Sequence, residues 1–433
     1  MKANRSAHYI IVLFSLFFIG KVFSQDITIT DLFEALKTQP ITQSDEFSVD
    51  KAKTGKQLVN SALYPKITGF GRYDNTSIAT GMIPVPPNVL FPLLQDQSIP
   101  QPFSKEIYSA GVNISMPIFV KSIYTLASQA GYLEKSAEAK KQINLLENEA
   151  VIVGSNANLL YLEALTKALD SKKQSLLKTK EIIEIKVNNG RAPGSSLLVI
   201  NNSINQVETS KNTIAIQREA AIASIENLTN IRLKSPIKML EVKGLDTLNM
   251  KALEPLEQKV KADKMGWRSE KERLLPSLSF FGNYYNSFAD SYNNNMAIDR
   301  DFTAFGLALN VPIFDKSQYA KIKKSKITYS ETQNELNQLE LSLKSQINQL
   351  TNSLELLYKS EKLYEQNIAD KTELLKIARV SYESSRISIE DYLKYEDDLI
   401  LEKSNLYKSQ AEKWQTLVKL AVIYGNNIED IIK

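Results

Sequence analysis

The sequence predicts a mixed, mainly α-helical protein made of two internal repeats, each with two β-strands followed by a pair of very long helices. Three observations predict this fold class. Long stretches lack helix-breaking residues, the chain matches itself at a constant offset, and four short segments alternate between apolar and polar residues. The helices are expected to pack as in a coiled coil and to be continuous with the strands.

The long helices are predicted by where proline and glycine are missing. No proline occurs in residues 118–192, 194–235 or 313–433, and no glycine lies between Pro312 and Gly425. Because these two residues break helices, such gaps indicate helices of unusual length. Apolar residues also recur in steps of three, four or seven, which is typical of near-parallel packed helices. A fibrous coiled coil would give the same periodicity. One such series is Leu162, Leu169, Leu176 and Ile183.

An internal repeat is the second observation. Residues 111–119 match residues 306–314, including a shared Pro-Ile-Phe, at an offset of 195. The same offset places Gly190 on Ser385 and Asn230 on Gly425, so the register holds without insertion or deletion. Long helices that must end at the same level cannot change length independently, which accounts for the constant offset of 195.

Upstream of the Pro-Ile-Phe motif the match continues at an offset of 211, where Pro65 falls on Pro276. The two offsets, 211 and 195, differ by 16 residues, which indicates an insertion of that length in the first copy. The insertion coincides with the proline-rich segment 84–102. The two repeats are expected at about 31–231 and about 253–425, separated by a segment at about 232–252.

Each repeat is expected to begin with two strands in which side chains alternate between faces. Strands at ~10 residues with one apolar face are typical of membrane barrels, although a soluble hairpin covered by helices would show the same pattern. Membrane barrels need at least about eight strands, so four strands cannot close alone. A trimer would supply twelve strands for a transmembrane β-barrel. Phe70 and Phe281 lie on the otherwise polar face. The four strands are expected at about 65–75, 107–117, 276–288 and 302–312.

Residues 1–24 are expected to be a signal peptide. Lys2 and Arg5 precede an apolar run of about 12 residues that is too short to span a bilayer, although an uncleaved anchor would look similar. Residues 25–433 would then be the mature chain. Without the leader, the formal net charge falls from +4 to +1.

The composition excludes several classes of function. The one histidine, His8, lies in the expected leader, and the chain has no cysteine. Ser–His–Asp and Cys–His catalysis, Cys/His zinc sites and disulfides are therefore excluded from the mature chain. We expect no enzyme activity, no cofactor and no metal site, and the near-neutral charge gives no reason to expect a nucleic-acid partner.

Taken together, this layout resembles the TolC family of outer-membrane efflux proteins over residues 30–425. The resemblance rests on the two copies, on Leu-Tyr-Pro at 63–65 and Leu-Leu-Pro at 274–276, and on the Pro-Ile-Phe motifs that follow the strands. Short turns between long helices, at 190–196 and 385–391, complete it.

The resemblance implies that residues 25–433 form one outer-membrane efflux domain. It also implies a homotrimeric channel in the outer membrane of a Gram-negative cell, with its barrel in outer-membrane lipid and its helical tunnel in the periplasm. Its partners would be a periplasmic adaptor and an inner-membrane pump of the RND or ABC type. The 232–252 segment would form an equatorial layer, and the 84–102 insertion an extracellular loop. The alternative is a secreted or periplasmic coiled-coil scaffold or adhesin without membrane strands.

The resemblance also places the functional residues at the helix–turn–helix tips. Threefold symmetry would turn an acid at the second tip into a ring of three carboxylates, which Lys394 could neutralise from the same helix face. Asp391 could instead serve only to cap its helix. The aperture candidates are Glu390, Asp391, Lys394 and Ser196, and the adaptor-docking candidates are Gly190, Arg191, Gly194, Ser195, Arg386 and Ser388.

Overall fold

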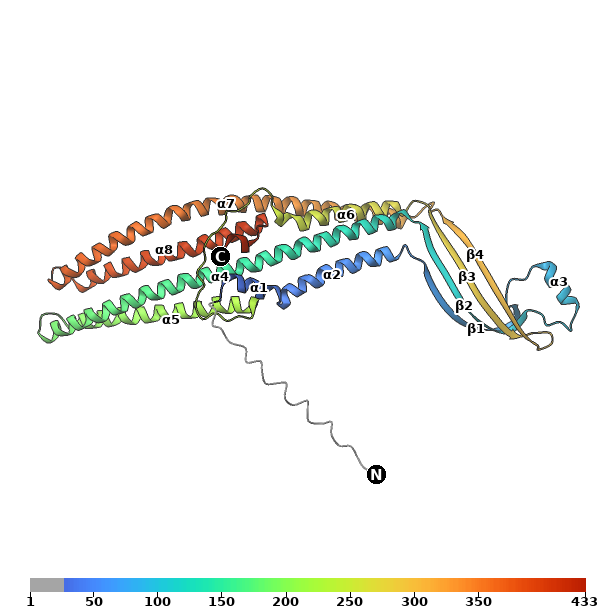
Figure 1. Cartoon of the computed structure of the whole chain (residues 1–433), viewed down its shortest axis with the longest axis horizontal. Coiled ribbons are helices and arrows are strands. Elements are labelled where there is room, and N and C mark those ends of the chain that lie inside the picture. The colour runs from blue at the N-terminus through green and yellow to red at the C-terminus, as the bar shows by residue number, and fades with distance from the viewer. Residues whose placement is uncertain (1–26) are drawn as a thin grey trace, which may run out of the picture.

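The computed structural model describes residues 27–433, so the expected signal peptide lies outside the described residues. The molecule is elongated, with helices running side by side along most of its length and a β-sheet at one end (Figure 1). The tips of two helical hairpins lie at the opposite end. Among residues 27–433, no helix is both long and apolar enough to cross a membrane.

Two hairpins of long helices form the body of the protein. Helix α4 (Lys121–Asn188) and helix α7 (Lys316–Glu383) have 68 residues each, which corresponds to about 100 Å of helix. Helices α5 (Ser195–Thr229) and α8 (Ile389–Tyr424) return alongside them, and α4 packs against α8 across the two hairpins. The predicted long helices are therefore confirmed.

Shorter helices extend each hairpin toward the sheet. Helix α1 (Ile29–Lys37) begins with a capping box and is followed by α2 (Pro40–Ser61), which packs along α4. In the second repeat, a 3-10 turn η1 (Lys251–Leu253) leads into α6 (Glu254–Glu272), which packs between α4 and α7. The short helix α9 (Ile428–Ile431) lies near the end of the chain.

The sheet has four antiparallel strands in the order β1-β2-β3-β4: β1 (Lys66–Gly81), β2 (Phe103–Phe119), β3 (Ser277–Asp290) and β4 (Ala297–Asn310). The sheet is open, because within the described chain β1 and β4 each pair on one side only. The predicted fold class, with four strands and two repeats, is confirmed.

The strands are longer than the alternation suggested. Strand β1 continues to Gly81 after its register shifts between Asn75 and Thr80, and β2 and β4 begin at Phe103 and Ala297. The extra residues lie beyond the register shift or near the hairpin turns, where small and polar residues hide the period of two. The insertion expected to be a loop contains a short helix, α3 (Pro87–Gln95).

The main core lies at the middle of the helices. One cluster joins apolar residues of α1, α4, α5, α8 and α9 with Leu233 and Met239 of the segment between the repeats. An isolated β-bridge pairs Glu241 with Ile432, which holds that segment against the end of the chain. Both ends of the described chain therefore meet the inter-repeat segment at one level.

Candidate functional site

The first hairpin tip is the turn between α4 and α5. Gly190 has a φ of 67°, and the amide of Arg191 donates to the carbonyl of Lys186 at 2.7 Å, which closes the end of α4. Arg191 and Gly194 are exposed, and α5 starts at Ser195. Ser196, an aperture candidate, lies in the first turn of α5 and is partly buried, and its amide donates to the carbonyl of Pro193 at 3.0 Å.

The second tip, between α7 and α8, is capped by a side chain. Ser388 is the N-cap of α8, and its Oγ accepts from the amide of Asp391 at 3.1 Å and donates to Oδ2 of Asp391 at 2.9 Å. The carboxylate of Asp391 thus sits at the positive end of α8 and stabilises it. This is the capping role that the sequence left open beside the aperture role.

The remaining tip candidates are exposed. Glu390, Asp391 and Lys394 all face solvent in the single chain, as does Arg386 in the turn. No ion pair joins Lys394 to Asp391 among the residues that the structure describes. The tip therefore presents two carboxylates and separate cationic groups, Lys394 and Arg386.

A buried polar network above the tips joins the two hairpins. Tyr392 of α8 is 2% exposed, and its hydroxyl donates to Oε1 of Glu396 at 2.7 Å. Ser175 of α4 also donates to Glu396 and lies 3.3 Å from the hydroxyl of Tyr392. Burial raises the pKa of Tyr392 to about 12, so it remains a hydrogen-bond donor. The sequence reasoning missed these residues, although Tyr392 and Glu396 share an apolar helix face.

A second contact between the hairpins lies closer to the tips. The ammonium of Lys186 in α4 is 4.6 Å from the ring centroid of Tyr382 in α7 and donates to that residue's carbonyl at 3.3 Å. The ring of Tyr382 stacks on Tyr392 at 5.5 Å. Together with the polar network, this contact fixes how far apart the two tips lie within one chain.

A carboxyl group is buried at the middle level of the helices. Glu149 of α4 is 1% exposed, and its Oε2 has no hydrogen-bond partner within the described chain. Burial, with a smaller effect from the charge of Glu429 and an opposing one from Lys37, raises the pKa of Glu149 to about 7. This carboxyl is therefore partly protonated near neutral pH.

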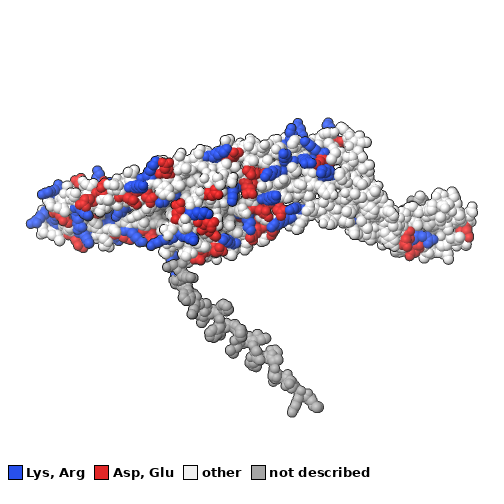
Figure 2. Space-filling model, turned by 45° about the horizontal axis from the view of Figure 1, so that its top comes forward, with Lys and Arg blue, Asp and Glu red and all other residues white. Residues whose placement is uncertain are grey.

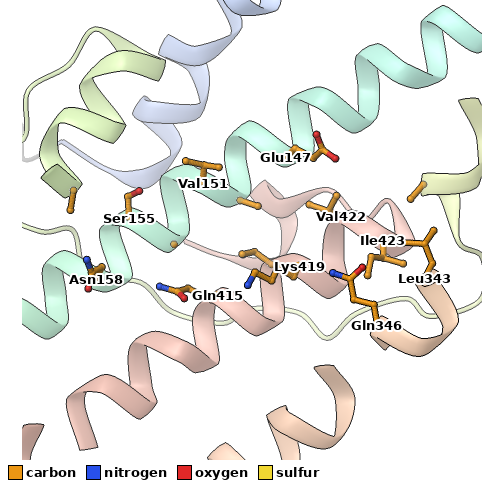
Figure 3. A pocket seen from close by; sticks show the side chains of 15 residues that line it. Glu147, Val151, Ser155, Asn158, Leu343, Gln346, Gln415, Lys419, Val422 and Ile423 are labelled. Atoms are coloured by element: carbon orange, nitrogen blue, oxygen red, sulfur yellow. The ribbon is translucent and has the colours of Figure 1, made fainter. Parts of the chain in front are cut away.

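A hollow of about 580 Å³ lies near the same level, between α4, α7 and α8 (Figure 3). Gln415 and Lys419 of α8 and Gln346 of α7 project into it, opposite Val151 of α4. Within residues 27–433, no group of three or more His, Cys, Asp or Glu side chains could hold a metal ion. The polar groups of the hollow offer hydrogen bonds and charge.

The outer face of the sheet is apolar and exposed. Val112 of β2 and Phe305, Leu307 and Leu309 of β4 are all well exposed large apolar side chains. Figure 2 shows charged residues over the helices and at the far end of the sheet, with a band free of them between these regions. An exposed apolar band of this kind fits contact with lipid.

An aromatic row borders this apolar face on its far side. Tyr73 and Tyr108 have ring centroids 4.8 Å apart, and Tyr108 and Phe288 have theirs 5.3 Å apart. Each of these residues pairs directly with the next across the ladder, so the row runs across β1, β2 and β3. Aromatic girdles at the edges of the lipid-facing band are typical of outer-membrane barrels.

These features define a class of fold: a four-stranded sheet with an exposed apolar face that continues into long helical hairpins. Residues 248–426 match the family model described as outer membrane efflux protein. A search of curated proteins gives no match. The second repeat thus carries the sequence signal of the family.

Solved structures match nearly the whole chain. The CmeC outer membrane channel of Campylobacter jejuni is 15% identical, with a TM-score of 0.77 over 92% of this chain and 85% of that one. The outer membrane protein VceC of Vibrio cholerae is 16% identical, with a TM-score of 0.75 over 92% of this chain and 95% of that one. The open state of the MtrE outer membrane channel of Neisseria gonorrhoeae is 15% identical, with a TM-score of 0.70 over 93% of this chain and 90% of that one.

The family match over residues 248–426 and the shared fold show that the chain is similar to TolC-like outer membrane efflux proteins. The family consists of channels rather than enzymes, and its members lie in the outer membrane and extend into the periplasm. The coiled-coil scaffold without membrane strands is not favoured, because the chain has the sheet of these channels.

Proposed function

We propose that this chain is the exit duct of a tripartite export system and that three copies form one channel. The observation that carries the proposal is the open four-stranded sheet, which has an apolar outer face and leads directly into helices of 68 residues. Three copies supply twelve strands, which are enough to enclose a pore, whereas four are not. The channel performs no chemistry: it encloses water and connects two compartments.

The helices support the same assembly. Helix α7 leaves a series of large apolar side chains exposed in the single chain, and a single long helix does not keep such a series in water without a partner. A neighbouring protomer on each side would cover them as the helical barrel closes. The series comprises Leu341, Leu356, Leu363, Ile377 and Val380.

The partners follow from the family and from the position of the tips. Outer membrane efflux channels work with an adaptor and an inner-membrane pump. In this chain the exposed tip residues would dock the adaptor, and the pump would be of the RND or ABC type. The docking residues we propose are Gly190, Arg191, Gly194, Ser195, Arg386 and Ser388.

The aperture is proposed at the same end. Glu390 and Asp391 would form rings of carboxylates in a trimer, with Lys394 nearby and Ser196 on the first tip. Each of the three charged groups is exposed in the single chain, which leaves it available to line a narrow pore. The ring of Asp391 would attract cations while its cap hydrogen bonds hold it in place.

The test is the assembly and conductance of the purified full chain. In detergent we expect a mass three times that of one chain, and in planar bilayers we expect ion conductance. Leu307→Asp places a charge on the outer face of β4 and should abolish insertion. Asn310→Asp, at the end of the same strand, is the matched control. A water-soluble monomer that conducts no ions would contradict the proposal.

A further inference from the structure

The inner face of the sheet carries an aromatic row that a polar pore wall does not require. Phe70 of β1, Tyr285 of β3 and Phe302 of β4 lie at one level, because each aligns with the next through the ladder by way of Gly111 of β2. The ring centroids of Phe70 and Tyr285 are 6.4 Å apart, and those of Tyr285 and Phe302 are 5.1 Å apart. We call these three side chains the inner aromatic row.

Gly111 is what allows this row to be continuous. Phe70 and Tyr285 belong to strands that both neighbour β2, so their rings can meet only if the residue between them has no side chain. A Cβ at position 111 would lie 2.5 Å from Cβ of Tyr285, a distance at which no side chain fits. The three rings are all partly buried, so each still presents surface to the inside of the sheet.

Cationic side chains lie in the next row toward the far end of the sheet. This row contains Arg72, Ser109, Ser287 and Arg300, which align with one another across the four strands. Arg72 pairs with Asp74 at 2.6 Å. Arg300 makes no ion pair with any described residue, and one of its nitrogens donates to the backbone carbonyl of Asp299 at 3.0 Å. Arg300 is exposed and lies on the same face of β4 as Phe302, one row farther from the helices.

The two faces of the sheet differ in charge. On the inner face, Asp74 is outnumbered by cations. On the outer face, the acids lie in the far half of the strands, where Asp299 shares the row of Phe288 and Asp301 lies one row nearer the helices. Because the inner face has more cationic than acidic side chains and the outer face has only acidic ones, the inner face favours anions. By the alternation of the strands, the inner face carries Lys66, Arg72, Asp74, Lys105 and Arg300, and the outer face carries Glu106, Asp290, Asp299 and Asp301.

We propose that the inner aromatic row and Arg300 form a stacking site for flat aromatic anions that pass through the barrel. The ring faces bind the planar apolar part of the molecule, and the guanidinium binds its negative group. This inference rests on the proposed function, since it requires the inner face to line a pore. The site is shallow, and weak binding suits a duct that must release what it binds.

The test uses the full-length trimer in planar bilayers and the dye 8-anilinonaphthalene-1-sulfonate, added on the side of the sheet. We expect the dye to block the current, and the double variant Phe70→Leu/Phe302→Leu to raise its half-blocking concentration about tenfold. Leucine keeps the apolar volume but removes the ring faces. Phe305→Leu, on the outer face of β4, is the matched control and should leave the block unchanged.

A second comparison separates stacking from simple attraction of anions. Methanesulfonate carries the same charged group without rings, and we expect it to block far more weakly than the dye. Arg300→Gln should weaken the block by the dye without changing the mass of the trimer. Equal block by the two anions, or an unchanged block in the leucine double variant, would overturn the site while leaving the channel in place. Absence of any conductance in the unmodified protein would overturn both proposals.

Discussion

Gly190 and Ser385, which lie 195 residues apart, occupy the same position in the two hairpin turns, and both have a left-handed backbone, with φ values of 67° and 56°. In each turn the amide of the next residue donates to a carbonyl five residues earlier, from Arg191 to Lys186 and from Arg386 to Ser381. The repeat therefore conserves the backbone of the turn, but only one copy uses the residue that adopts it without strain.

Replacing Ser385 by glycine should consequently stabilise the protein. A residue with a Cβ in the left-handed region costs about 1 kcal/mol relative to glycine, so Ser385→Gly should raise the melting temperature of the trimer. Ser384→Gly is the matched control, because Ser384 has a φ of −82° and glycine there only adds flexibility to the unfolded chain. A Ser385→Gly variant that melts below the unmodified trimer would contradict this reading of the turn.

Glu149 makes stability depend on pH in a defined direction. Its pKa is about 7 in the folded protein against an ordinary value of 4.5, so the folded state binds more protons between these pH values. Stability therefore falls as the pH rises from 4.5 to 7 and stays reduced above that range. Glu149→Gln removes the buried charge and should stabilise the trimer above pH 7 by up to about 3 kcal/mol.

The measurement is the melting temperature of the Glu149→Gln variant and of the unmodified protein at pH 4 and pH 8. The difference between them should be large at pH 8 and small at pH 4. The exposed Glu147, half a turn earlier on α4, offers the control Glu147→Gln, which should melt like the unmodified protein at both pH values. An equal difference in melting temperature between Glu149→Gln and the unmodified protein at pH 4 and pH 8 would show that this carboxyl does not titrate as described.

Asp391 can be tested for the aperture separately from its capping role. We expect Asp391→Ala to reduce cation preference, seen as a shift in reversal potential under a salt gradient, while the trimer still assembles. Ser388→Ala removes the hydroxyl that caps α8 and should lower the free energy of unfolding by about 1 kcal/mol, but it keeps the carboxylate of Asp391. If both variants keep the original reversal potential, Asp391 only caps α8.

The contact between α4 and α8 should limit how far the tips separate. Tyr392→Phe removes the donor to the buried Glu396, whose side chain is 3% exposed, and leaves it with one fewer hydrogen bond. The loss should destabilise the hairpin contact by about 1–3 kcal/mol and raise the conductance of the channel. Tyr395→Phe, at an exposed position of the same helix, should do neither.

The sequence predicts the parts of this fold that depend on local signals. Missing prolines predict α4 and α7, and Asn230 and Gly425 end α5 and α8 in the same left-handed conformation at the expected offset. The buried network of Tyr392 and Glu396 was not predictable in this way, because a glutamate at helical spacing looks like a solvated residue until α4 covers it.

The sheet also contains contacts that local sequence signals do not predict. Phe70 could be recognised from the alternation as an aromatic residue on a polar face, but its neighbours could not. Tyr285 and Phe302 meet it only through the register of three ladders, which no local pattern contains. The C-terminal end of β1, at Gly81, also lies beyond the predicted end, because the strand register shifts after Asn75 and the alternation of side chains shifts with it.

The close approach of β2 and β3 at Gly111 gives a final prediction. A methyl group there would lie 2.5 Å from Cβ of Tyr285 and 2.3 Å from the carbonyl oxygen of Tyr284, so Gly111→Ala must push the two strands apart. Because β2 and β3 are the central pair of the sheet, we expect little trimer in the outer-membrane fraction. Gly71→Ala is the matched control, since a Cβ there meets no described atom within 4 Å. Equal yields of trimer from the two variants would mean that β2 and β3 can separate at this level without loss of the barrel.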